Sequence, residues 1–242
     1  MDAIILGDGG LGRAIEAALR ARGDAVRVLG RPATGRHDTA ALGSADVVFE
    51  ASRGDAVAAN VDAALASGAR RLVIGTTGWD GDRDWVGSLV REAGAAAVVA
   101  PNLSLGAALF FRLVEAAASL YGAVDAFDPF IVEWHRRSKR DRPSGTAREL
   151  VRRIATAHHA APPDELEVAV IRAGSSPGMH LVGFDAPGET VELRLTARDR
   201  SAYAAGALAA ADWLLRESRP AGIHAFDPVV DELLRPLVAV PA

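Results

Sequence analysis

The sequence predicts an α/β protein in which an N-terminal doubly wound parallel sheet is followed by a second, α+β domain built on a mixed or antiparallel sheet. Two observations carry this prediction. Up to residue 100, short apolar segments alternate with helical patterns, as in consecutive β-α-β units. From residue 166 on, three strand-like segments follow one another with no helix between them. We therefore place the first domain at 1–102, completed by about 214–242, and the second at 103–213.

The composition is that of a globular protein and narrows the classes of function. Half of the 242 residues are hydrophobic, enough for one large or two small domains. The net charge of −4 argues against a general binder of polyanions, so we expect no nucleic-acid partner. Cysteine is absent, which excludes disulfides, thiolate nucleophiles and Cys-based metal sites, and no other metal site is expected. No apolar run reaches the length of a membrane span and no leader follows Met1, so the cytoplasm is the expected location.

The elements of the first domain follow from apolar runs and their spacing. The run at 3–6 predicts the first strand, and a helical face from Leu11 to Leu19 predicts a helix that continues to Ala21 and ends at Gly23. Further strands are expected at 25–29, 46–50, 71–74 and 96–100, with helices at 56–67 and 85–93.

The second domain begins with a connector at 101–106 and a helix that extends to about Tyr121. Strands are expected at 130–135, 166–172, 179–185 and 190–196, and helices at 146–157 and 202–216. The last strand alternates clearly between apolar and charged residues, which indicates one buried face. Thr146 and Glu149 have the spacing of a capping box at the start of the helix at 146–157.

A glycine-rich turn separates the first strand from the first helix. It reads Gly7-Asp8-Gly9-Gly10-Leu11-Gly12 and matches the dinucleotide-binding, Rossmann-type fingerprint. Such glycines let the backbone approach a pyrophosphate, and the helix N-terminus attracts its charge. We interpret Gly7, Gly9, Gly10, Leu11 and Gly12 as cofactor-binding residues; a purely structural turn is the alternative.

The end of the second strand bears on the choice of cofactor. Arg31 lies there, with Arg36 nearby and no acidic residue before Asp38. An arginine suits the 2′-phosphate of NADP, whereas an acid would bind the ribose of NAD. This favours NADPH, with NADH left open and a merely solvated arginine as the alternative.

A second polar turn, Gly75-Thr76-Thr77-Gly78, follows the fourth strand. Ligands of doubly wound sheets bind at the carboxyl ends of the strands. We interpret Gly75, Thr76 and Thr77 as residues on the nicotinamide side of the cofactor, against the alternative of an ordinary turn.

The richest stretch is the loop EWHRRSKRDRPSGTA at 133–147, which contains Lys139, the only lysine of the chain. His135 can supply a proton and Lys139 a compact ammonium. Ser144, Gly145 and Thr146 open the next helix, where hydroxyls and free N–H groups form a receptor for a carboxylate. The alternatives are a strand-end histidine satisfied by a neighbour and a chance solvated lysine.

This loop, Glu133-x-His135-x-x-x-Lys139-x-Asp141-x-Pro143-Ser144-Gly145-Thr146-Ala147, resembles the signature loop of the 4-hydroxy-tetrahydrodipicolinate (dihydrodipicolinate) reductase family of lysine and diaminopimelate biosynthesis. The segments 75–78, 100–106, 172–174, 178–180 and 200–207 are similar to the family's in the same order. The resemblance implies an NADPH- or NADH-dependent reductase, a dicarboxylate substrate and a homotetramer. His135 would be the general acid, Lys139 would contact a substrate carboxylate and support His135, and Ser144, Gly145 and Thr146 would hold a carboxylate. Pro101 and Asn102, in the interdomain segment, would line the cofactor.

The chain departs from the family pattern at two positions. Arg136 stands where the family usually has a second histidine that touches the substrate, and Leu195 stands where another histidine is common. Arg136 can still bind a carboxylate, so the departures bear on the substrate rather than the fold. A reductase of another cyclic imine or amino-acid-like acid, and a non-catalytic NADP-binding sensor, are the alternative functions. We interpret His158 and His159 as surface residues, and His180 as a weaker site candidate because such a histidine is often structural.

Overall fold

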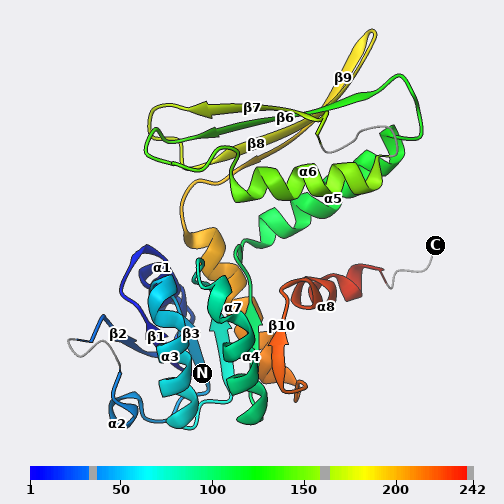
Figure 1. Cartoon of the computed structure of the whole chain (residues 1–242). Coiled ribbons are helices and arrows are strands. Elements are labelled where there is room, and N and C mark those ends of the chain that lie inside the picture. Colours follow the sequence, from blue (N-terminus) through cyan, green and yellow to red (C-terminus); the bar gives the residue numbers. More distant parts are fainter. Residues whose placement is uncertain (33–36, 159–163, 239–242) are drawn as a thin grey trace. The chain divides into compact units, whose positions relative to one another are not determined.

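The computed structural model describes residues 1–32, 37–158 and 164–238 and divides into two compact units (Figure 1). One unit comprises Met1–Leu105 and Arg200–Ala242, and the other comprises Gly106–Asp199. The predicted boundaries differ from this division at 103–105 and 200–213, which lie in the first unit. The physical reason is close packing in that unit: a Cβ at Gly206 would lie 1.6 Å from the carbonyl oxygen of Leu103.

The first unit is built on a six-stranded parallel sheet with the order β10-β5-β4-β3-β1-β2. The strands are β1 (Asp2–Leu6), β2 (Ala25–Leu29), β3 (Val47–Glu50), β4 (Arg71–Ile74), β5 (Ala96–Val99) and β10 (Gly222–His224). The helices are α1 (Gly10–Arg22), α2 (Thr39–Leu42), α3 (Val57–Ala66), α4 (Arg83–Glu92), α7 (Ser201–Arg216) and α8 (Asp227–Val238). Short 3-10 turns, η1 (Gly54–Ala56) and η2 (Asp80–Asp82), precede α3 and α4.

Helices cover both faces of this sheet. Alternate strand residues such as Ile4 and Leu6 pack with α3 and α4 in one core cluster. Helices α1 and α7 pack against each other, and α7 also packs on β4. The doubly wound parallel sheet predicted from the sequence is therefore confirmed, and β10 adds a sixth strand that the sequence pattern does not predict.

The second unit has a four-stranded mixed sheet with the order β7-β6-β8-β9. Its strands are β6 (Asp128–His135), β7 (Glu167–Arg172), β8 (Met179–Ala186) and β9 (Glu189–Thr196). Strand β7 is parallel to β6, whereas β8 pairs antiparallel with β6 and β9. This confirms the predicted α+β domain with a mixed sheet.

Two helices, α5 (Leu105–Tyr121) and α6 (Gly145–Ala157), lie on one face of this sheet (Figure 1). Their apolar residues, including Val114 and Ile154, form a core with Ile131 and Val182 of the strands. The other face carries exposed Trp134 and Ile171. In the described segments no helix is long and apolar enough to cross a membrane.

Candidate active site

The glycine turn has the geometry that a phosphate-binding turn requires. Gly7 has a φ of 118°, and a Cβ there would lie 2.4 Å from the carbonyl oxygen of Ala51. A Cβ at Gly12 would lie 1.9 Å from the carbonyl oxygen of Gly7, so neither position has room for a side chain. Gly9, in contrast, faces open space at the start of α1. The backbone is thus tightly folded on one side and accessible on the other, which fits a bound pyrophosphate.

Two charged side chains lie beside this turn. The guanidinium of Arg200 covers Gly10, since a Cβ at that glycine would lie 2.6 Å from Nη1. The Asp8 carboxylate turns toward Gly30, where a Cβ would lie 3.3 Å from Oδ2. Arg31 itself is exposed, and Arg36 lies outside the described residues.

The second polar turn lies against the first. A Cβ at Gly75 would lie 2.8 Å from a methyl group of Leu11 and 3.1 Å from one of Leu103. Thr76 is buried, and its carbonyl oxygen accepts a hydrogen bond of 2.8 Å from Trp79 Nε1, whereas Thr77 is exposed. The structure therefore brings two separately predicted cofactor segments together at the carboxyl ends of the strands. Pro101 is exposed, and Asn102 accepts a hydrogen bond of 2.9 Å from Ser104 N.

A buried acid under these turns is not predicted from the sequence. Glu50 ends β3 and is 1% exposed. Its Oε1 accepts hydrogen bonds from Asn60 Nδ2 at 3.0 Å and from Ser52 Oγ, and its backbone oxygen accepts one from Gly75 N at 3.0 Å. Burial raises the pKa of Glu50 more than these hydrogen bonds lower it.

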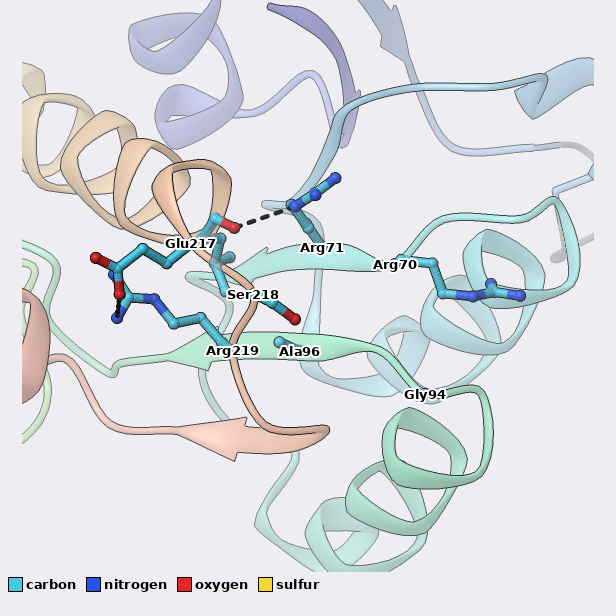
Figure 2. Close-up of a pocket in the computed structure, with 8 residues that line it drawn as sticks. Arg70, Arg71, Gly94, Ala96, Glu217, Ser218 and Arg219 are labelled. Atoms are coloured by element: carbon cyan, nitrogen blue, oxygen red, sulfur yellow. Dashed lines mark hydrogen bonds and ion pairs between the residues drawn. The ribbon is translucent and has the colours of Figure 1, made fainter.

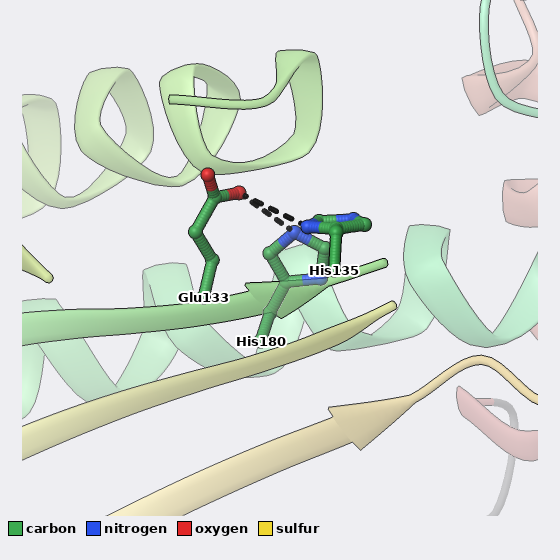
Figure 3. A group of neighbouring side chains, drawn as sticks. All are labelled: Glu133, His135 and His180. Atoms are coloured by element: carbon green, nitrogen blue, oxygen red, sulfur yellow. Dashed lines mark ion pairs between the residues drawn. The ribbon is translucent and has the colours of Figure 1, made fainter. Parts of the chain in front are cut away.

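The functional side chains of the second unit meet at one end of the sheet. The strand register places His135 opposite Arg172, and Glu133 opposite His180. Residues that are far apart in the sequence thus share a single buried cluster at the end of β6 (Figure 3).

Glu133 lies at the centre of this cluster. Its Oε1 accepts a hydrogen bond of 2.6 Å from Arg172 Nη2, and both side chains are fully buried. Ser144 N also donates to this carboxylate at 3.1 and 3.2 Å. The other oxygen, Oε2, lies 3.6 Å from both His135 Nδ1 and His180 Nε2 (Figure 3).

The cluster sets the charges of its members. Burial alone would raise the pKa of Glu133, but hydrogen bonds from Ser144 and the charge of Arg172 outweigh it, so this pKa is lowered. Burial lowers the pKa of His135, with Glu133 opposing and Lys139 adding to the effect. Burial and the neighbouring His135 lower the pKa of His180 to about 4. Both imidazoles are therefore neutral near pH 7 in the free protein.

The three side chains also have the spacing of a metal site. Their ligand atoms lie within 4.8 Å of one another, a grouping that the sequence does not predict. However, the Glu133 carboxylate already accepts hydrogen bonds from the Arg172 guanidinium and the Ser144 backbone. A dication would also be repelled by that guanidinium, so the donor set does not favour a metal ion.

The predicted loop cations lie at the edge of the cluster. Lys139 Nζ is 2.9 Å from Asp141 Oδ1, and both side chains are partly exposed. Arg136 is exposed and its Nε donates to Ser138 Oγ at 3.2 Å. Lys139 does not hydrogen-bond His135 in the described contacts, but its charge reaches that imidazole.

The start of α6 corrects the predicted capping box. Ser144, not Thr146, is the N-cap, and its Oγ accepts a hydrogen bond of 3.1 Å from Ala147 N. Glu149 instead forms ion pairs with two arginines of the same helix, Arg152 and Arg153. Gly145 has open space around it and Thr146 is half-buried, so the first turn of the helix keeps an accessible side.

The expectation that His158 and His159 lie at the surface is tested only for His158. His158 is 3% exposed, so the prediction of a surface residue is wrong for it, and His159 lies outside the described residues. Sequence reasoning misses the role of Arg172 in the cluster and names His180 only as a weaker site candidate. The only signal was their place in segments similar to the family's.

A pocket elsewhere in the first unit is not part of this chemistry. It is lined by residues that include Arg70, Arg71, Glu217 and Arg219 (Figure 2). Arg70 and Arg71 lie at the amino end of β4, whereas the two polar turns lie at the carboxyl ends of the strands. Its arginines are occupied, for example by the hydrogen bond of 3.1 Å from Arg71 Nε to the carbonyl oxygen of Leu214.

The doubly wound sheet with its glycine turn, together with a separate unit that holds a histidine–carboxylate–arginine cluster, defines a two-domain oxidoreductase of the dinucleotide-binding class. The family model described as "Dihydrodipicolinate reductase, C-terminus" matches residues 106–229. A relative from Archaeoglobus fulgidus named 4-hydroxy-tetrahydrodipicolinate reductase is 35% identical over 203 residues, 77% of this chain and 76% of that protein. A relative of the same name from Wolinella succinogenes is 37% identical over 194 residues, 73% of each chain. The chain belongs to the dihydrodipicolinate reductase family.

A solved structure agrees with this at the level of the fold. The dipicolinate-bound dihydrodipicolinate reductase from Paenisporosarcina sp. TG-14 superposes with a TM-score of 0.72 at 19% identity, over 93% of this chain and 97% of that one. The family model and the two relatives confirm the family resemblance read from the loop at 133–147.

Proposed function

We propose that this protein reduces 4-hydroxy-tetrahydrodipicolinate to tetrahydrodipicolinate with a nicotinamide cofactor, in lysine and diaminopimelate biosynthesis. Family membership supports this reaction, since the relatives carry the name of that reductase. The observation that carries the proposal is the buried cluster of Glu133, His135 and Ser144 at the start of α6.

The cofactor belongs to the first unit. Gly7, Gly9, Gly10, Leu11 and Gly12 would hold its pyrophosphate, and Gly75, Thr76, Thr77, Pro101 and Asn102 would line the nicotinamide side. When bound, the cofactor supplies the hydride. The contact of Gly75 with Leu11 supports a single continuous cofactor surface.

The choice between NADPH and NADH depends on two side chains of opposite charge. Arg31 favours the 2′-phosphate of NADPH. Asp8, which turns toward Gly30 next to Arg31, would repel a phosphate placed there. We propose NADPH as the preferred cofactor and expect the Asp8→Asn variant to increase that preference. Steady-state rates with each cofactor measure it.

His135 would supply the proton that accompanies the hydride. The substrate loses its hydroxyl group as water, and the resulting α,β-unsaturated imine takes up one hydride and one proton. Because Nδ1 of His135 faces Glu133 Oε2, the proton would leave from Nε2. The imidazole is neutral in the free protein, and the negative charge of a bound dicarboxylate would raise its pKa toward the working pH.

The substrate carboxylates would be held by the loop and the helix start. Ser144, Gly145 and Thr146 offer hydroxyls and first-turn N–H groups at the positive end of α6. Lys139 would exchange Asp141 for a carboxylate, and Arg136 would bind from the exposed side of the loop.

The direct test follows oxidation of NADPH and NADH with freshly made substrate from a coupled synthase. The His135→Ala variant should lose roughly 100- to 10,000-fold in kcat with little change in cofactor affinity. The Lys139→Ala variant should have a lower kcat and a higher KM. Arg140→Ala, which removes an exposed cation from the same loop, is the matched control. Unchanged rates in both site variants would refute the assignment.

A second candidate rests on Arg136, which replaces an imidazole by a longer, permanently charged group. The same fold would then reduce another cyclic imine or amino-acid-like acid. Cofactor binding without turnover of the lysine-pathway substrate, but with turnover of another acid in a substrate panel, would favour it. Binding without any turnover would favour a sensor.

We also propose that the protein is a homotetramer assembled through the second unit. The sheet face opposite α5 and α6 exposes Trp134 and Ile171, and large exposed apolar residues mark association surfaces. Light scattering after size exclusion should report four chains, and Trp134→Glu should lower that number.

A further inference from the structure

We propose that Arg172 is a positioning residue that fixes the loop at 136–143 by holding the backbone of Asp141, and with it Lys139, in place. This role rests on the proposed function and deepens it, because it names the group that orients the cation of the proposed substrate site. The loop itself does not contain that group, since Arg172 is the last residue of β7.

The guanidinium of Arg172 joins the loop to the buried cluster. Its Nη2 donates one hydrogen bond of 2.6 Å to Glu133 Oε1 and another of 2.6 Å to the backbone oxygen of Asp141. Its Nη1 donates to the backbone oxygen of Ile171 at 2.9 Å, and its Nε is buried with no hydrogen-bond partner among the described residues. Because the Arg172 side chain is fully buried, it does not touch a substrate itself, and any effect on binding passes through the groups that it holds.

Asp141 carries this constraint to the ammonium of Lys139. The carboxylate oxygen Oδ1 of Asp141 lies 2.9 Å from Lys139 Nζ, whereas the backbone oxygen of Asp141 is held by Arg172. The side chain and the backbone of one residue therefore have separate partners. In the proposed substrate site, a substrate carboxylate would take the ammonium from the Asp141 side chain while the backbone remains fixed, so Lys139 would stay within reach. Such preorganisation lowers the cost of ordering the loop on binding.

The loop is attached to the neighbouring strand segment near both of its ends. Near its start, Arg137 N donates to the backbone oxygen of Gly174 at 3.1 Å. Near its end, Arg172 Nη2 holds Asp141. The first attachment depends on no side chain, whereas the second depends on one guanidinium. Removal of that guanidinium should therefore release the part of the loop that contains Lys139 and leave the first attachment in place.

Three variants separate positioning from stability. Arg172→Met removes the guanidinium and leaves Glu133 charged and unpaired, so it weakens folding as well as the loop. Glu133→Gln/Arg172→Met also releases the loop, but it leaves no unpaired charge and does not change the net charge beside the proposed substrate site. Glu133→Gln alone is the matched control, since it keeps the hydrogen bond from Arg172 to Asp141. If Arg172 only stabilised the second unit, the affinity for a dicarboxylate would recover in the double variant together with the stability.

The first measurement is the affinity for dipicolinate, a stable dicarboxylate, by calorimetry on the full chain. Both variants without Arg172 should bind it roughly 10-fold more weakly and Glu133→Gln alone less than about 3-fold, in line with the loss of one hydrogen bond from a charged group. Cofactor affinity should not change in any of them. Equal affinity of the double variant and the wild type, or an equal loss in Glu133→Gln alone, would overturn the proposal.

The second measurement needs no ligand and uses the single lysine of the chain. Protein labelled with nitrogen-15 lysine gives one backbone amide signal, that of Lys139, and its relaxation reports the fast motion of the loop. The backbone should be rigid in the wild type and in Glu133→Gln, and mobile in the double variant. Equal relaxation in all three proteins would contradict the proposal. If the wild type fails to bind dipicolinate, the proposed substrate site is wrong, and the relaxation of Lys139 still decides whether Arg172 fixes the loop.

Discussion

The buried ion pair of Glu133 and Arg172 should dominate the stability of the second unit. The Arg172→Met variant keeps most of the apolar stem and removes the guanidinium. Glu133 then keeps its hydrogen bond from Ser144 but loses its cation in a place with no exposure to water. Breaking a buried pair in this way costs about 3–5 kcal/mol, because one charge remains uncompensated.

Two comparisons make this magnitude specific. Arg152→Ala breaks an exposed pair with Glu149 in the same unit and should cost less than about 1 kcal/mol. The double variant Glu133→Gln/Arg172→Met leaves no unpaired charge and should be more stable than Arg172→Met alone. The difference between wild type and Arg172→Met should also shrink in acid. The folded-state pKa of Glu133 is lowered, so its stabilising effect is lost as the pH falls through that pKa.

Urea unfolding can be followed for each unit separately. Of the four tryptophans, Trp134 lies in the second unit and the other three in the first. Fluorotryptophan NMR with the Trp134 signal as reporter therefore gives the free energy of unfolding of the second unit. A loss below about 1 kcal/mol for Arg172→Met, equal to that for Arg152→Ala, would refute the reasoning.

One further prediction concerns Gly178 of the second unit, and another concerns Glu50 of the first. A Cβ at Gly178 would lie 3.1 Å from His135 Nε2, so Gly178→Ala should displace the imidazole and lower kcat about 10-fold or more. Gly81 faces open space, so the control Gly81→Ala should leave kcat unchanged. Equal kcat values for the two variants would show that a methyl group at position 178 does not displace His135. Glu50→Gln should flatten the pH dependence of stability. Burial raises the folded-state pKa of Glu50, so the wild type loses stability as the pH rises from the unfolded-state pKa to the folded-state pKa. The loss is about 1.4 kcal/mol for each pH unit between the two pKa values. A Glu50→Gln variant whose free energy of unfolding depends on pH as steeply as that of the wild type would contradict this.

Much of the fold can be predicted from the sequence because its elements have regular patterns. The strands at 25–29 and 71–74 have the predicted bounds, and Gly23 ends α1 in a left-handed conformation. Strand β10 has only three residues, too few to show alternation. The place of α7 could not be predicted, because its small residues fit either unit until the contact with Leu103 is seen.

The candidate site, like the fold, has parts that the sequence predicts and parts that it does not. Residues close in sequence, such as His135 and Ser144, are predicted from the loop alone. Arg172 and His180 reach the cluster only through strand register, since a shift of one residue would turn each side chain to the opposite face. Sequence reasoning therefore finds the candidate residues of a single loop more readily than the residues that strand register adds to the cluster.

Two of the cation–carboxylate pairs of the second unit, Arg172 with Glu133 and Lys139 with Asp141, explain why a lysine and an arginine are not interchangeable here. The Arg172 side chain is fully buried and pairs with Glu133, so its guanidinium stays beside that carboxylate in the folded protein. Lys139 and Asp141 are partly exposed, and such pairs contribute at most about 1 kcal/mol. In the proposed substrate site, a carboxylate would therefore displace Asp141 at little cost, whereas it would not displace Glu133. An arginine at position 139 could form bidentate hydrogen bonds with the same carboxylate. The same bidentate geometry would hold Asp141 more firmly. A compact ammonium in an exposed pair thus suits the role proposed for Lys139, in which it would change partners when the substrate binds.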